Sequence, residues 1–100
     1  MKGGQSGSMK INKDNFINEM RSKNSKSLDF IVDEYSNLLF KIISNVLNSN
    51  FYSEHVEECV NDTFWSIWTN IDSFDEEKGE FKHWIGAIAK FKAIDYKRKL

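Results

Sequence analysis

The chain contains no proline, and only two of its five glycines, Gly79 and Gly86, lie beyond residue 7. Proline removes a helix hydrogen bond and clashes with the preceding turn, and glycine is the other common helix breaker. A chain with so few of both can run in long uninterrupted helices. Its 100 residues, 40% hydrophobic and 29% charged, fit one small globular domain with a modest core.

Apolar residues recur at three- and four-residue steps along most of the chain, a pattern typical of amphipathic helices. The clearest helix spans 26–48. The next runs from about 54 to 71, with Ser53 as its N-cap. A shorter helix over 12–22 comes first, and a last one starts near residue 79 or 80 and continues to the end. No strand-like alternation stands out. The sequence therefore predicts an all-α fold, a compact bundle of three long helices plus a short leading helix.

The last helix is predicted to have two different faces. Five large apolar residues form the face that should point inward: Phe81, Trp84, Ile85, Ile88 and Phe91. At about 100° per residue, another arc combines lysines with small residues: Lys82, Gly86, Lys90, Ala93 and Lys97, with His83 beside them. Small residues would let a polyanion approach the backbone, and lysines would contact its phosphates. Asp95 falls on the apolar side and is predicted to need a buried partner.

The net charge of -1 hides a segregation of charge along the chain. Residues 54–80 carry nine acidic residues and one lysine, whereas residues 82–99 carry six basic residues and one aspartate. An acidic surface and a basic surface would suit two different partners, although plain solvation of two polar helix faces would give the same pattern.

Several classes of function have no support in the sequence. No apolar run is long enough to cross a bilayer. The single Cys59 cannot form an internal disulfide, which suits a reducing cytoplasm. His55 and His83 have no cysteine neighbour at metal-ligand spacing, so no metal site is predicted. No nucleophile–base pair or phosphate-cradling glycine loop appears, so the chain is predicted to be no enzyme and to need no cofactor.

The opening MKGGQSGS, residues 1–8, has no pattern. It is predicted to be a disordered cloning remnant ahead of a second start at Met9, with the domain occupying 9–100.

Two stretches of the second half carry a combined pattern. Residues 56–75, VEECVNDTFWSIWTNIDSFD, have an acidic pair, an amide, Phe and Trp, and an Asp-containing entry into a loop. Residues 79–99, GEFKHWIGAIAKFKAIDYKRK, have an aromatic residue, a Trp, an apolar pair, Ala-Ile-Asp and a terminal basic cluster. From about residue 25 on, the chain resembles region two of a bacterial RNA polymerase sigma factor, of the extracytoplasmic-function type.

The resemblance implies a transcription initiation module without catalysis. In the family, the outer face of the second long helix docks on the clamp coiled coil of the polymerase β′ subunit. The loop and last helix capture the non-template strand of the promoter −10 element, with one base flipped into a pocket of the loop. Such factors work in the cytoplasm and are often held inactive by an anti-sigma factor, and none of these roles involves membrane insertion.

Carried over residue by residue, the resemblance gives two sets of candidates. The polymerase-binding set is Glu57, Glu58, Asn61, Asp62 and Trp65. The DNA-binding set is Phe74, Asp75, Lys78, Lys82, His83, Trp84, Lys90, Lys97 and Arg98. The chain departs from the family at Asn61, where Gln is usual, and at Lys90 and Phe91, where Arg-Asn is usual. It also stops inside the last helix, so the family's second domain, a promoter-reading helix-turn-helix, is expected to belong to a longer protein.

Simpler interpretations remain open for each set. Trp65 points away from the apolar stripe of its helix, so it is either an interface anchor or a residue covered by another helix. The carboxylates and lysines could be ordinary surface residues, Phe81 and Trp84 core residues, and the loop a linker. A helical module that self-associates through its acidic helix and basic tail is the alternative function.

Overall fold

The computed structural model describes residues 10–48 and 53–99. Its four α-helices are α2 (Phe16–Arg21), α3 (Ser25–Val46), α4 (Val56–Thr69) and α5 (Phe81–Lys99). Two single 3-10 turns flank α4: η1 (Ser53–His55) and η2 (Ile71–Ser73). Within the described ranges there is no strand, and the predicted all-α bundle of three long helices plus a short leading helix is confirmed. The predicted cloning remnant and most of the turn after α3 lie outside these ranges.

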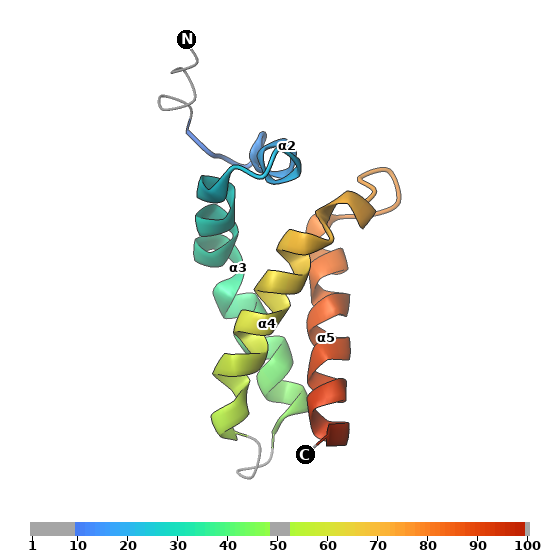
Figure 1. Ribbon diagram of the computed structural model, residues 1–100. Helices are drawn as coiled ribbons and strands as arrows, with labels where there is room; N and C mark the ends of the chain where they lie inside the picture. Colours follow the sequence, from blue (N-terminus) through green and yellow to red (C-terminus); the bar gives the residue numbers. More distant parts are fainter. Residues whose placement is uncertain (1–9, 49–52, 100) are drawn as a thin grey trace.

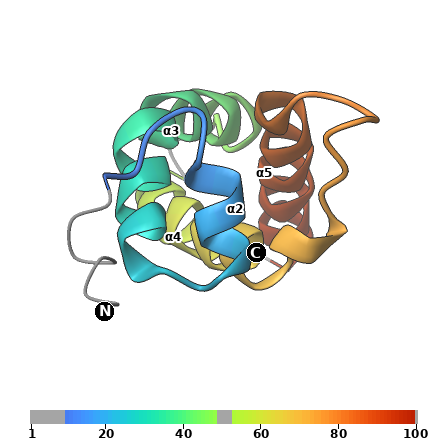
Figure 2. The ribbon, with the colours of Figure 1, turned by 90° about the horizontal axis from the view of Figure 1, so that it is seen from above.

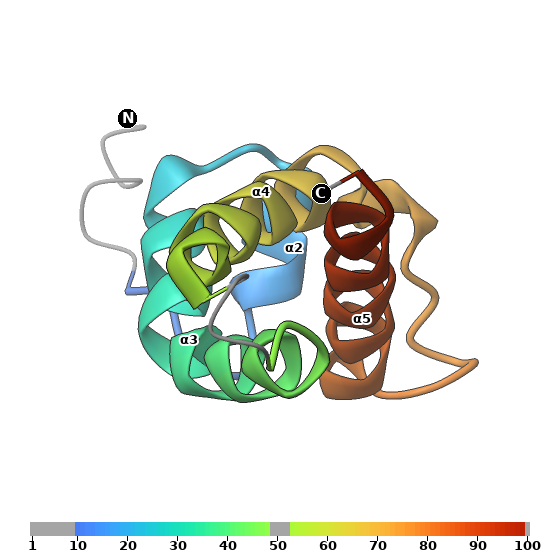
Figure 3. The same cartoon turned by 90° about the horizontal axis from the view of Figure 1, so that it is seen from below.

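The three long helices lie side by side and alternate in direction, α3 and α5 running one way and α4 the other (Figure 1). Seen from the end, each of them packs against both of the others (Figure 3). The short helix α2 lies across one end of the bundle, as the view from above shows (Figure 2). The loop between η2 and α5 projects at this same end, and the carboxyl end of α5 lies at the opposite one.

The connection between α2 and α3 ends one helix and starts the next. The Asn24 N–H donates to the Glu19 carbonyl at 2.9 Å and the Lys23 N–H to the Met20 carbonyl at 3.0 Å, which is the Schellman arrangement. It places Lys23 in the left-handed region, at φ 60°. The Asn24 side chain then accepts from the Lys26 N–H at 3.0 Å and caps α3.

The start of α4 differs from the prediction. The α-helix begins at Val56 and its N-cap is His55, whose side chain makes no capping bond. Ser53 opens the preceding 3-10 turn and is not the N-cap of the α-helix. Inside α4, the buried Thr63 hydroxyl donates to the Cys59 carbonyl at 2.8 Å, so this polar group is satisfied within its own helix.

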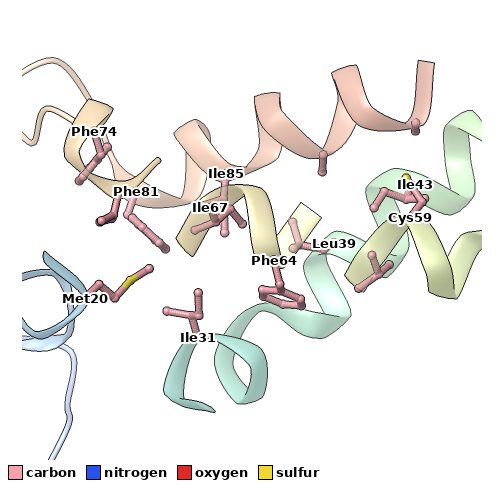
Figure 4. Packing of buried hydrophobic residues seen from close by; sticks show 14 of the residues in the cluster. Met20, Ile31, Leu39, Ile43, Cys59, Phe64, Ile67, Phe74, Phe81 and Ile85 are labelled. Carbon is pink, nitrogen blue, oxygen red and sulfur yellow. The ribbon is translucent and has the colours of Figure 1, made fainter. Parts of the chain in front are cut away.

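One continuous core runs through the bundle (Figure 4). Ile31, Leu39 and Ile67 are fully buried in its middle, where α3 meets α4. An aromatic group closes the end under α2: the Phe16 ring meets the Phe81 ring edge-on, with centroids 5.0 Å apart. The short helix is therefore part of the core and not an appendage.

Helix α5 is rotated about its axis relative to the prediction. Its buried residues are Phe81, Ile85, Ala89 and Ala93. The predicted inward position of Phe91 is wrong, since its side chain is 69% exposed. The placement of Ala93 on the DNA-facing arc is also wrong, because Ala93 is fully buried. Asp95 is exposed and needs no buried partner, contrary to the prediction.

Small residues explain this rotation. Gly86 faces α3, where a Cβ built on it would lie 3.5 Å from Ile42 Cδ1. With Ala89 and Ala93 on the inward side, α5 can approach its neighbours closely, and the larger Phe91 then stays outside.

Candidate nucleic-acid and protein interfaces

The loop between η2 and α5 is held by bonds within itself. The Asp75 carboxylate accepts from the Glu77 N–H at 2.9 Å, and the Asp75 carbonyl accepts from the Lys78 N–H at 3.0 Å. These bonds form a turn with an aspartate at its first position, a residue type that such turns favour. The Glu80 carbonyl then accepts from the His83 and Trp84 N–H groups and starts α5.

Arg21 ties this loop to α2. Its Nη2 donates to the Phe74 carbonyl at 2.9 Å, and its Nη1 lies 3.8 Å from Glu76 Oε2. Lys23 makes a second tie. Its Nζ donates to the Trp68 carbonyl at 2.8 Å and lies 4.9 Å from the centroid of the Trp68 ring. Two cations from the α2 end thus fix both the last turn of α4 and the start of the loop.

The loop and the first turn of α5 enclose a hollow of about 320 Å³, the loop pocket. Its lining residues are Ser73, Phe74, Asp75, Lys78, Gly79, Glu80, His83 and Trp84. The rings of Phe74 and Trp84 form its apolar wall, tilted by 41° with centroids 5.2 Å apart. The Phe74 ring also meets the ring of Phe81, which does not line the pocket, edge to face at 5.4 Å. Charged groups of both signs surround the rings, so the pocket can receive a flat ring that also has hydrogen-bonding edges.

The predicted DNA-binding residues fall into separate places. Those that line the loop pocket are Phe74, Asp75, Lys78, His83 and Trp84. Phe74 is buried, so it contributes a wall and not an exposed ring. Lys82 lies on the other side of the α5 start, in a hollow next to α2. Lys90, Lys97 and Arg98 are exposed farther along α5.

A second hollow, of about 290 Å³, runs between α3 and α4 and is named the α3–α4 groove. It is lined by Leu28, Val32, Ser36, Phe40, Glu57, Val60, Asn61, Phe64 and Trp65. Trp65 is 62% exposed at its rim, so the interpretation in which another helix covers it is wrong. Phe40 and Val32, at 39% and 37% exposure, extend the apolar surface onto α3.

The predicted polymerase-binding set does not form one surface. Glu57, Asn61 and Trp65 line the α3–α4 groove. Glu58 and Asp62 face α5 instead, where the Tyr96 hydroxyl donates to both carboxylates. Burial of the Tyr96 hydroxyl, together with these two carboxylates, raises the pKa of Tyr96.

The single cysteine of the chain has an ordinary structural role. Cys59 is fully buried, and burial raises the pKa of its thiol to about 11. His83 lies 3.9 Å from Glu80 on the exposed start of α5. Among residues 10–48 and 53–99, no group of three or more His, Cys, Asp or Glu side chains could hold a metal ion. None of the described helices combines the length and apolar character that a bilayer crossing requires.

Sequence reasoning missed several residues of these surfaces. Arg21 acts across 53 positions of sequence, and no local pattern points to such a contact. Val32 belongs to the apolar repeat that predicted the helix over 26–48, whereas Phe40 was not singled out at all. Phe91 could have been found by treating Ala89 and Ala93 as the inward positions of α5, because small residues mark close helix contacts.

Comparison with known proteins gives a family. The family model for sigma-70 region 2 matches residues 31–100, which is most of the chain. Neither the curated proteins nor the solved structures contain a significant match to it. The family match covers most of α3 and all of α4, the loop and α5. Of the surfaces described above, it leaves out Leu28 in the α3–α4 groove and the ties from Arg21 and Lys23. The chain belongs to the sigma-70 region 2 family, the non-enzymatic part of transcription initiation factors that binds RNA polymerase and recognises the promoter −10 element.

Proposed function

We propose that this domain, of the extracytoplasmic-function type, captures the non-template strand of the −10 element while it is docked on the clamp coiled coil of the polymerase β′ subunit. It would act in the cytoplasm, where polymerase and promoter DNA meet, and residues 9–100 would form the working domain. The observation that carries the proposal is the loop pocket, which lies where the acidic loop meets the basic last helix.

The loop pocket suits a base that has left the stack. Flipping a base costs a few kcal/mol, which stacking and edge contacts in a pocket can offset. The aromatic wall at Phe74 and Trp84 supplies apolar contact, and Lys78 and His83 supply donors. Because Arg21 and the Asp75 turn hold the loop in place, the pocket exists before any strand arrives.

The α3–α4 groove suits the polymerase. An exposed Trp surrounded by an amide and a carboxylate is typical of an interface anchor, since large aromatic residues carry much of the binding energy at interfaces. Glu58 and Asp62 could join the contact by exchanging the Tyr96 hydroxyl for basic residues of the clamp. Their exposed positions would affect association rate and specificity more than affinity.

Calorimetric titration of the protein with a fragment carrying the β′ clamp coiled coil tests the docking. We expect saturable binding that Trp65→Ala and Asn61→Ala each weaken roughly tenfold or more. Trp65 is exposed, so its truncation opens no core cavity. Asp95→Asn on α5, outside the groove, is the control and should bind normally.

If the clamp fragment still binds Trp65→Ala but no longer binds Asn61→Ala, the contact does not include Trp65 at the groove rim, and the docking proposal stands. Absence of binding at every attainable concentration would contradict it. Sedimentation that then showed concentration-dependent dimers would favour the self-associating module instead.

A further inference from the structure

Phe91 is the most exposed large hydrophobic side chain of the described residues, at 69%. It follows Trp84 and Ile88 at steps of four and three residues, so the three side chains lie along one face of α5. Trp84 is also a wall of the loop pocket. An apolar stripe, half-buried at Trp84 and Ile88 and exposed at Phe91, therefore leads from the loop pocket along α5.

A third hollow, of about 330 Å³, lies at the end of this stripe and is named the Phe91 hollow. It is lined by Ser66, Ile88, Phe91, Lys92, Ile94, Asp95 and Arg98. Residues 90–99 carry five basic side chains against the single carboxylate of Asp95. An exposed ring in such surroundings fits a polyanion with flat apolar groups, because cations attract its phosphates and the ring offers a surface for stacking. This positive charge distinguishes the Phe91 hollow from the α3–α4 groove, whose one charged lining residue is the acidic Glu57.

We propose that Phe91 is a second stacking site, for an unpaired base of the same strand that places another base in the loop pocket. The inference rests on the proposed function, since it assumes that α5 follows a single strand. Seven residues of helix separate Trp84 from Phe91, a rise of about 10 Å at roughly 1.5 Å per residue. Nucleotides stacked at about 3.4 Å would cover that distance in roughly three steps. Because every base has a flat face, this site adds affinity without selecting a base.

The test is a scan of single-stranded oligonucleotides that each lack one base, measured by fluorescence anisotropy at low salt. With the unaltered protein we expect two sensitive positions, about three nucleotides apart. Phe91→Ala should weaken the intact oligonucleotide roughly 5- to 150-fold and remove the sensitivity at one of the two positions only. Phe91→Trp should keep both sensitive positions, since tryptophan also offers an aromatic ring for stacking. Asn37→Ala, at an exposed neutral residue of α3 that lines none of these hollows, is the control and should change nothing.

The outcomes separate this inference from the function on which it rests. If Phe91→Ala binds every oligonucleotide like the unaltered protein, the second site is overturned and strand capture stands. It is also overturned if Phe91→Ala weakens the oligonucleotide lacking the second base as much as the intact one, because the ring would then not act through that base. If the unaltered protein binds no oligonucleotide even with the β′ clamp fragment bound, strand capture itself fails and the second site with it.

Discussion

At Gly86, α5 has room for one more methyl group. A Cβ built there would lie 3.5 Å from Ile42 Cδ1, an ordinary van der Waals distance. Glycine within a helix costs roughly 0.5–1 kcal/mol relative to alanine, because it gives up more backbone freedom on folding. We therefore expect Gly86→Ala to raise the free energy of unfolding by about 0.5–1 kcal/mol in urea denaturation. A lower stability would mean that α3 and α5 lie closer together than the distance to Ile42 indicates.

The close contact at Gly86 also explains why the predicted inward face of α5 was wrong. A helical wheel gives most weight to large apolar side chains, so the prediction included Phe91 in the inward face of α5. The bundle instead buries Ala89 and Ala93, whose small size lets the helices approach. The inward face of a helix depends on the side chains of the helices around it, here Ile42 of α3. The sequence of α5 alone therefore does not determine its inward face.

At the scale of single elements, we expect α2 to hold the loop between η2 and α5 in one conformation. Arg21→Ala removes the charge-assisted bond to the Phe74 carbonyl, a kind of bond worth about 1.5–3 kcal/mol. Because the Arg21 side chain is 33% exposed, we expect the lower end of that range. Amide exchange at Glu77 and Lys78 should then become roughly tenfold faster by mass spectrometry or NMR.

Two controls make the Arg21 result specific. Arg21→Lys keeps the charge but loses the planar fork, so it should restore part of the protection. Lys26→Ala, at an exposed basic residue of α3, should leave the loop unchanged. Unaltered exchange in Arg21→Ala would show that the turn at Asp75 is enough to hold the loop.

The elements themselves were largely predictable, and their mutual contacts were not. The 3.6-residue periodicity of 26–48 gave α3 to within two residues at either end, because one wide stripe faces the core along its whole length. The loop-pocket residues adjoin one another in sequence, so a family pattern could group them. The tie from Arg21 and the bond from Tyr96 to Glu58 join distant segments, and neither has a local signal.

For the whole molecule, the raised pKa values predict loss of stability at high pH. Burial raises the pKa of Cys59 from 9.0 to about 11, and that of Tyr35 and Tyr96 also rises. A raised pKa in the folded state means that folding holds the proton more tightly. The resulting stability is complete below the unfolded pKa and is lost as the pH rises toward the folded one. The Cys59 shift alone corresponds to roughly 2–3 kcal/mol between about pH 9 and pH 11.

Urea denaturation at intervals from neutral pH to about pH 11 measures this loss. The double variant Cys59→Ala, Tyr96→Phe should be less stable at neutral pH, since it loses core and hydroxyl contacts. Its free energy of unfolding should nevertheless fall less steeply at alkaline pH than that of the unaltered protein. Parallel curves for the two proteins would contradict the assignment of the alkaline loss to these groups.

The place of Phe16 and Met20 has a consequence for anyone who prepares a fragment of this protein. The family match starts at residue 31, whereas the core already contains both of these side chains. A fragment trimmed to the matched residues would leave one edge of the Phe81 ring in water and cut the anchor of the loop. The family match and the hydrophobic core therefore begin at different residues, and a fragment meant to fold should be designed to include the whole core.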